Sequence, residues 1–249
     1  MQSLENKIVS WISDYLKTNN LTSLIIGISG GVDSAVTSTL CAMTGYDTKL
    51  LIMPIHQNIN ETKRGLNHCS FLEKKFKNVE TLTSDLSDVY EQIIKKIPNK
   101  YHNKLSLANT RARLRMSTLY MLSGGINGIV VGTGNKVEDF GVGFFTKYGD
   151  GGVDISPIAD LMKSEVYELA KKLNINKEII DAPPTDGLWE DGRTDEDQLG
   201  VTYDDLEWAM NCADEILDEK STSILQIYNK HRKNNLHKMQ KIPVFKKDV

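Results

Sequence analysis

The sequence predicts an α/β fold: a doubly wound parallel sheet with flanking helices, in a single domain that ends in a helical segment. Three observations lead to this prediction. Short apolar runs alternate with stretches of helical periodicity through the first half of the chain. The intervening helices are long enough to carry the chain back to the same edge of a parallel sheet. With 249 residues, 40% of them hydrophobic, the chain can bury a large core.

The expected elements follow one another regularly up to residue 132. The N-terminal sequence MQSLENKIVSWISDYL has the pattern of an amphipathic helix. Strands are expected at 21–28, 49–55, 79–83 and 128–132. Helices are expected at 35–43, within 61–76, at 85–96 and at 104–123. Because each strand is separated from the next by at least one helix, the sheet should be parallel and covered on both faces.

The second half is less regular. Glycine and aromatic residues dominate 132–157, and a helix is expected to begin near Met162, where apolar residues start to recur at helical spacing. Residues 183–200, PPTDGLWEDGRTDEDQLG, are acidic and rich in turn residues, which predicts a flexible lid loop. Two further helices are expected at 203–220 and 221–234.

Composition excludes several classes of protein. A net charge of −3 gives no support to a nucleic-acid partner, and no apolar run approaches the roughly 18 residues of a membrane span. The amphipathic N-terminus does not resemble a signal peptide. The three cysteines, Cys41, Cys69 and Cys212, form no CxxC pair, which excludes a zinc ribbon or a disulfide framework. We therefore expect a cytoplasmic protein that binds neither nucleic acid nor membrane.

The turn after the first strand carries the most informative motif, GISGGVDSAV. Ligands bind beyond the carboxyl ends of parallel strands, and the N-terminus of the following helix offers unpaired N–H groups to a phosphate. Gly30 and Gly31 let backbone amides approach phosphate oxygens, while Ser29 and Ser34 add hydroxyl groups. The carboxylate of Asp33 would repel a phosphate unless a cation lay between them, so the motif also predicts magnesium.

Other interpretations of this turn fit less well. A Walker A motif requires a lysine after the glycines, and none is present. The dinucleotide motif GxGxxG fails because Gly27, Gly30 and Gly31 have the wrong spacing. A tight turn with a helix cap would explain one glycine and one serine, but it does not require the others.

The residues SGGVDS match the SGGxDS loop of the ATP-pyrophosphatase (PP-loop) superfamily. Members of this superfamily cleave ATP to AMP and pyrophosphate, and the resemblance implies that the loop holds the departing pyrophosphate. Later segments are similar to NAD synthetases, in the same order along the chain: NTRARLRMSTLY, VVGTGNKVED, GFFTKYGDGGVDISPI, DLMKSEVYELAKKL, PTDGLWEDGRTDEDQLGVTYDDLE and a final HK pair. The resemblance covers residues 21–243.

The resemblance implies a single domain over 1–249 of the ammonia-dependent type, because the 28 residues before Ser29 leave no room for a glutaminase domain. It implies a reaction in which the nicotinate carboxylate of deamido-NAD attacks the α-phosphate of ATP and gives an acyl-adenylate and pyrophosphate. Ammonia then attacks the activated carbonyl, and AMP leaves. It also implies a homodimer with deamido-NAD across the interface and the helix that carries Arg113 buried between the subunits.

Two alternatives stay open at this point. One is another PP-loop enzyme, such as a GMP-synthetase-like amidase or a tRNA-thiolating enzyme, although the latter predicts paired cysteines and basic surfaces that the chain lacks. The other is a non-catalytic nucleotide sensor on the same fold. The presence of Asp33, Glu138 and Lys163 together argues against a sensor.

The resemblance assigns site residues one by one. The expected ATP contacts are Gly27, Ile28, Ser29, Gly30, Gly31, Val32, Asp33, Ser34, Thr133, Lys163 and Thr185. The expected deamido-NAD contacts are Arg113, Lys147, Asp154, His237 and Lys238. Magnesium is expected on Asp33 and Glu138, and no protein nucleophile is needed.

The residues themselves support only part of this assignment. A lysine at the start of a helix is electrostatically misplaced, which favours a phosphate contact for Lys163. Helical periodicity does not choose among Arg111, Arg113 and Arg115. The chain also departs from the family pattern in two places: PPTDGLW has an extra proline, and Met239 stands where the family often has arginine. Trp189 and the acidic residues after it are expected to belong to the lid.

Overall fold

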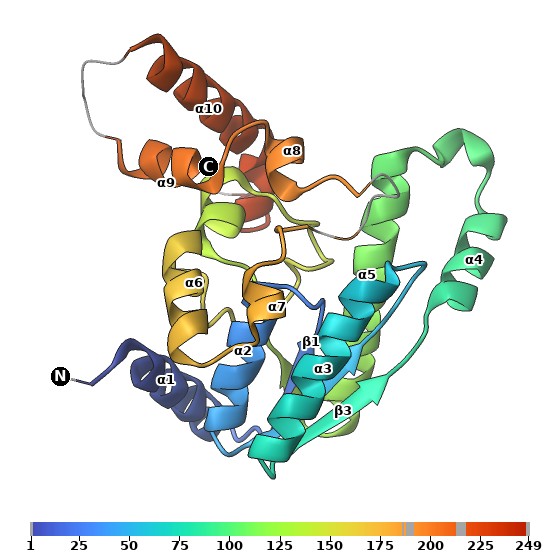
Figure 1. The fold of residues 1–249 in the computed structure, drawn as a ribbon. Coiled ribbons are helices and arrows are strands. Elements are labelled where there is room, and N and C mark those ends of the chain that lie inside the picture. Colours follow the sequence, from blue (N-terminus) through green and yellow to red (C-terminus); the bar gives the residue numbers. More distant parts are fainter. Residues whose placement is uncertain (1, 186, 188–191, 213–217, 248–249) are drawn as a thin grey trace.

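The computed structural model describes residues 2–185, 187, 192–212 and 218–247 (Figure 1). Four strands form a parallel sheet in the order β3-β2-β1-β4: β1 (Ser23–Gly27), β2 (Asp47–Ile52), β3 (Val79–Thr83) and β4 (Gly128–Val130). Each strand overlaps the range that the sequence predicts. Because β2 and β4 flank β1, the strand order reverses there, and the loops after β1 and β4 meet beyond the sheet.

Helices cover both faces of the sheet. One face packs against α1 (Leu4–Thr18), α2 (Val32–Met43), α3 (Ile59–Lys75) and α6 (Lys163–Lys172). The other packs against α4 (Ser87–Lys96) and α5 (Lys104–Gly125). Within β1, Leu24 and Ile26 belong to the first core and Ile25 to the second, as the alternation of side chains along a strand requires. The predicted doubly wound α/β fold is confirmed.

The C-terminal part is helical and lies beyond the sheet, at the top of Figure 1. It contains α8 (Asp195–Leu199), α9 (Tyr203–Asn211) and α10 (Glu219–Met239), whereas the short helix α7 (Lys177–Ile180) packs against α2 and α6, with Ile179 in the first apolar core. A π-helical turn, Val137–Val142, packs against α8 and α9 in a third apolar cluster. The π-helical turn and α7 were not predicted, because both are too short for a periodic pattern to reveal.

Two expectations about this part are corrected. The segment 183–200 is not a continuous loop, because α8 begins after Thr194, whose side chain forms a capping box with Asp197. The helix predicted over 203–220 ends at Asn211, since Cys212 has an extended backbone with ψ 119°. Residue Trp189 and the segment 213–217 lie outside the described residues. Within the described ranges, no helix has both the length and the apolar character that crossing a membrane requires.

Candidate active site

The glycine turn after β1 is held in shape by its own side chains and by α3. Gly30 has φ +86°, and a Cβ on it would lie 2.5 Å from the carbonyl oxygen of Glu61. The hydroxyls of Ser29 and Ser34 lie 3.1 Å apart, and the Ser29 Oγ accepts a hydrogen bond from the Gly31 N–H. No side chain caps the N-terminus of α2, so its first N–H groups suit an anionic ligand.

Three residues predicted from distant parts of the sequence meet directly at this turn. The Lys163 ammonium, at the start of α6, lies 2.7 Å from Asp33 Oδ2 and 3.0 Å from Glu138 Oε1. Asp33 belongs to the first turn of α2, and Glu138 belongs to the π-helical turn beyond β4. The Lys163 side chain is only 3% exposed. Its ammonium forms ion pairs with both carboxylates.

The electrostatics of the three groups are unbalanced. Burial alone would lower the pKa of Lys163, but the two carboxylates outweigh burial and raise it, so the ammonium stays charged. For Glu138, Lys163 and a tyrosine hydroxyl outweigh burial and lower the pKa. For Asp33, burial prevails over Lys163 and raises the pKa. One ammonium therefore does not fully compensate two buried carboxylates, and a second cation would be stabilised here.

The same residues fit a magnesium ion. Mg²⁺ prefers oxygen ligands and is usually held by one or two carboxylates, with water and phosphate oxygens completing its coordination. Asp33 and Glu138 already lie on either side of one positive charge, the Lys163 ammonium, which shows that their oxygens converge. These are two carboxylates only: nowhere in the described part of the chain, this site included, are three or more His, Cys, Asp or Glu side chains arranged to hold a metal.

Two residues of this site were missed by the sequence analysis. Asn135 is fully buried; its amide donates to Asp33 Oδ1 over 3.0 Å, and its own oxygen accepts from the N–H groups of Val137 and Glu138. Tyr203 donates its hydroxyl to Glu138 Oε1 over 2.7 Å. The position of Asn135, just past a strand end, is the signal that was available for it. For Tyr203 no local pattern gives a signal.

Four of the five predicted deamido-NAD residues lie in a chain of contacts. Arg113 Nε donates to the Lys147 carbonyl over 3.2 Å, and Lys147 Nζ donates to the His237 carbonyl over 3.1 Å. Lys238, the neighbour of His237, donates to the Phe145 carbonyl over 2.6 Å. Arg113, Lys147 and Lys238 form no ion pair with a carboxylate of the described residues. Lys238 is attracted by the carboxylates of Asp139 and Asp150, so it is the neighbouring cations Arg113 and Lys147 that favour an anionic ligand.

The fifth, Asp154, is held by two hydrogen bonds at the edge of the sheet. Its carboxylate accepts from the Tyr120 hydroxyl and from the Val130 N–H, both over 2.8 Å. It also lines a cavity of about 460 Å³. The other lining residues include the aromatic side chains Trp11, Tyr15 and Phe140. Such a cavity suits a flat ring.

The remaining predicted residues are less closely connected. Thr133 is half-buried just beyond β4. The Thr185 hydroxyl donates to the Arg193 carbonyl over 3.3 Å and accepts from the Gly187 N–H. The structure also distinguishes Arg113 from Arg115, between which helical periodicity did not choose a substrate contact. Arg115 is tied to the Met53 carbonyl, whereas Arg113 is exposed beside Lys147.

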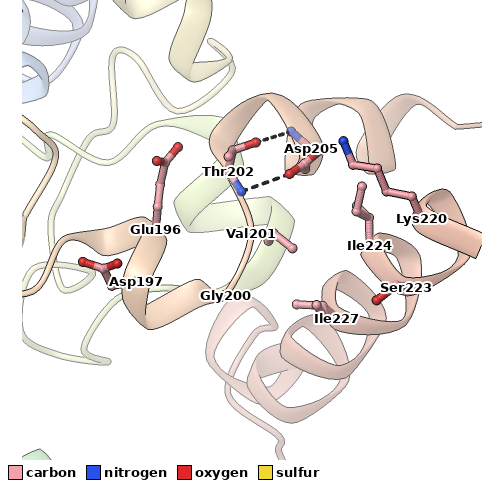
Figure 2. A pocket seen from close by; sticks show the side chains of 10 residues that line it. All are labelled: Glu196, Asp197, Gly200, Val201, Thr202, Asp205, Lys220, Ser223, Ile224 and Ile227. Atoms are coloured by element: carbon pink, nitrogen blue, oxygen red, sulfur yellow. Dashed lines mark hydrogen bonds between the residues drawn. The ribbon is translucent and has the colours of Figure 1, made fainter.

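A second hollow, of about 420 Å³, lies between α8, α9 and α10 (Figure 2). Several of its polar side chains form hydrogen bonds within or between these helices. Asp205 and Thr202 cap α9 through two reciprocal hydrogen bonds, and Glu196 Oε1 accepts the Tyr203 N–H over 2.9 Å. The hollow therefore marks the junction of these helices.

Comparison with known proteins identifies the family. The family model described as NAD synthase matches residues 4–249. The chain belongs to the NAD synthase family. It is therefore a ligase that forms a carbon–nitrogen bond with ATP and ammonia, as its curated relatives of the NH(3)-dependent type indicate.

Individual NAD synthases agree with this assignment over nearly the whole length. The NH(3)-dependent NAD(+) synthetase of Carboxydothermus hydrogenoformans is 35% identical, covering 95% of this chain and 94% of the relative. That of Alkaliphilus oremlandii is 37% identical, covering 94% and 92%. A solved structure of an NMN synthetase from Francisella tularensis has a TM-score of 0.87 at 34% identity, covering 98% and 97%. The NH3-dependent NAD synthetase of Campylobacter jejuni, solved with a nitrate ion, has a TM-score of 0.79 at 27% identity, covering 98% of both chains.

Proposed function

We propose that the chain amidates deamido-NAD with ammonia and ATP, through an acyl-adenylate, to give NAD, AMP and pyrophosphate. The main support for this proposal is that Lys163 forms ion pairs with Asp33 and Glu138 beside the glycine turn. A phosphate-binding helix N-terminus next to two carboxylates and a buried ammonium is suited to stabilising the charge that develops when pyrophosphate leaves. It is found here in a member of the NAD synthase family.

Each group has a role in the proposed reaction. The Ser29–Ser34 loop and the N-terminus of α2 hold the pyrophosphate that departs, while Lys163, a proposed ATP contact, reduces the repulsion between pyrophosphate and the two carboxylates. Asp33 and Glu138 would hold magnesium, which supplies positive charge to the phosphate oxygens when bound. Thr133 and Thr185 are proposed to contact ATP. Exclusion of water is needed because water would hydrolyse the adenylate, and segment 183–200 is proposed as the lid that provides it.

The acid substrate is proposed to bind where the positive charge collects. Arg113, Lys147, His237 and Lys238 would contact its diphosphate or carboxylate, and Asp154 would contact a hydroxyl or ring nitrogen. The cavity lined by Trp11, Tyr15 and Phe140 supports a substrate with a second aromatic ring. That argument favours the dinucleotide deamido-NAD over a smaller acid.

A second candidate substrate is nicotinate mononucleotide. The structurally similar protein from Francisella tularensis is described as an NMN synthetase, and the product NMN is the amide of this acid. Both candidates use the same chemistry at the nicotinate carboxylate. They differ in whether the aromatic cavity is occupied.

A homodimer is also proposed, with α5 at the interface. The exposed stripe of α5 carries residues at helical spacing: Arg113, Ser117, Tyr120, Met121 and Gly124. Met121 is 81% exposed, and Tyr120 bonds Asp154, so the apolar part of the stripe adjoins two proposed substrate contacts. A cytoplasmic location is proposed as well, because three free cysteines fit a reducing compartment.

The test is mass spectrometry of products from purified protein with ATP, magnesium and ammonium. Parallel reactions contain deamido-NAD, nicotinate mononucleotide or xanthosine monophosphate. We expect NAD and AMP in equal amounts with deamido-NAD. NMN and AMP would select the second candidate, and AMP with xanthosine monophosphate alone would select the GMP-synthetase-like alternative. Absence of AMP from every reaction would contradict the proposal and favour a nucleotide sensor.

A further inference from the structure

Tyr203 occupies a position that the reaction chemistry does not by itself explain. It is the first residue of α9, is 6% exposed, and places its hydroxyl 2.7 Å from Glu138 Oε1 and 3.4 Å from Asp195 Oδ2. Its ring faces the Lys163 ammonium, with Nζ 4.8 Å from the ring centroid. A single side chain therefore contacts a proposed magnesium ligand, the buried lysine and the first residue of α8.

We propose that Tyr203 is a positioning residue, whose hydroxyl orients the Glu138 carboxylate for magnesium and couples it to helix α8 through Asp195. This inference rests on the proposed magnesium role of Glu138. Partners that orient a metal-binding carboxylate commonly change metal affinity when they are removed.

The hydroxyl, and not the ring, carries this role. Packing in the apolar cluster of Val137, Leu199 and Leu206 requires only an aromatic ring, which phenylalanine would supply. Burying a hydroxyl is costly unless it is hydrogen-bonded, and here its bond goes to a charged group. Burial and the neighbouring carboxylates raise the pKa of Tyr203 well above its usual value, so the hydroxyl stays a donor. It donates to Oε1, the same oxygen that Lys163 contacts, so two donors hold this oxygen in place.

Helix α8 is attached to Tyr203 at two points. Asp195, itself 6% exposed, faces the Tyr203 hydroxyl, and Glu196 accepts the Tyr203 N–H. The Asp195 N–H also donates to the Pro184 carbonyl over 3.0 Å, which joins α8 to the chain just before Thr185. Movement of the tyrosine would thus reach a proposed ATP contact.

The hydroxyl has one hydrogen and two carboxylates within reach. The shorter distance assigns that hydrogen to Glu138. A cation bound to Glu138 would fix the position of its carboxylate and, through the hydrogen bond, the position of the Tyr203 side chain. Metal binding would then tighten the contact between Tyr203 and α8.

The first test compares Tyr203→Phe with Tyr228→Phe, a matched variant of a half-buried tyrosine that packs on the same apolar cluster. Binding of Mn²⁺ is measured by electron paramagnetic resonance with a non-hydrolysable ATP analogue, which requires no turnover. We expect Tyr203→Phe to weaken Mn²⁺ binding about 10-fold, and Tyr228→Phe to leave it unchanged. Equal Mn²⁺ affinity in both variants would overturn the positioning role.

The second test measures hydrogen exchange of the α8 amides with and without Mg²⁺ and the same analogue. We expect Mg²⁺ to slow exchange in the wild-type protein and to have little effect in Tyr203→Phe. Asp195→Ala, which removes the accepting oxygens, should lose the response while retaining Mn²⁺ affinity. A response to Mg²⁺ that persists in both variants would overturn the coupling. Because neither readout uses NAD formation, failure of the proposed function would be seen separately, in the product assay.

Discussion

Asp33 is the proposed magnesium ligand whose ionised form burial disfavours, and its charge can be removed by a single substitution. Burial raises the pKa of this carboxyl despite the contact with Lys163, so a bound cation is what would keep it ionised. Asp33→Asn nearly retains the shape, but it removes the charge and one of the two oxygens that accept from Asn135 and Lys163. Since even groups that only orient a metal ligand are worth about 10–100-fold, we expect turnover to fall by at least about 100-fold at ordinary magnesium concentration.

The matched control for this prediction is Asp88→Asn, an exposed aspartate in the first turn of α4. It should keep wild-type turnover and magnesium dependence. Initial rates measured over a range of magnesium concentrations decide the question. Wild-type rates for Asp33→Asn would remove this residue from the proposed metal site.

His68 gives a prediction about stability. Its Nε2 lies 2.9 Å from Ser38 Oγ between α3 and α2, and burial lowers its pKa from 6.5 to about 4. The folded state therefore favours the neutral ring, and the unfolded chain binds more protons between those two values. This contribution is present above pH 6.5 and is lost as the pH falls towards 4.

Urea unfolding of wild type and His68→Gln, at one protein concentration, measures this contribution. Between about pH 7.5 and about pH 5 we expect the free energy of unfolding to drop by about 2 kcal/mol more in the wild type than in the variant. Other titrating groups are common to both proteins and cancel in the comparison. Parallel curves for the two proteins would show that His68 does not titrate as inferred.

At the level of elements, helix α3 limits the conformation of the glycine turn. Gly30→Ala would force a Cβ against the Glu61 carbonyl and strain a positive φ. We expect a loss of about 1–3 kcal/mol, or about 2–4 °C in Tm for each kcal/mol. Gly31→Ala is the control, because its Cβ would meet only Ser29 Oγ at 3.4 Å. Thermal unfolding that ranks Gly31→Ala as the more destabilised variant would contradict this account of the turn.

The sequence predicted elements well where the pattern is local and long. All four strands and helices such as α5 follow from the apolar period, and Met162 stands next to the observed start of α6 at Lys163. Helix α8 was missed because its five residues are too few to show helical periodicity. Thr194 and Asp197, which form its capping box, were the available sequence signal. The end of α9 was misplaced because the acidic, amphipathic sequence pattern continues past Asn211, where the helix ends.

The same distinction explains the site. Asp33, Glu138 and Lys163 were expected from motifs and a family resemblance, and they lie in contact. Asn135 and Tyr203 were not expected, because their importance comes from contacts that span 102 and 65 residues of sequence. Such contacts depend on which loops meet beyond the sheet, and that follows from the strand order.

For the whole molecule, the strand order brings the site together and also leaves it open on one side. The loops after β1 and β4 carry proposed ATP contacts, whereas Arg113 belongs to the exposed stripe of α5 and Lys147 lies beside it. A substrate bound along this stripe would be exposed to water unless a second copy covered it. In a two-fold symmetric dimer the same surface of both subunits forms the interface, so the α5 stripe of one copy would cover that of the other.

Met121→Glu tests this arrangement. Met121 is 81% exposed on the stripe, and a charge there would be desolvated in a dimer but would stay hydrated in a monomer. We expect sedimentation equilibrium to show a dimer for the wild type and a monomer for the variant, with NAD formation reduced as the dimer is lost. The control, Leu66→Glu, places the same charge at a 40% exposed leucine on α3, which packs on the opposite face of the sheet. A variant Met121→Glu that stays dimeric would exclude the α5 interface, and a monomer with full activity would show that one subunit contains the complete site.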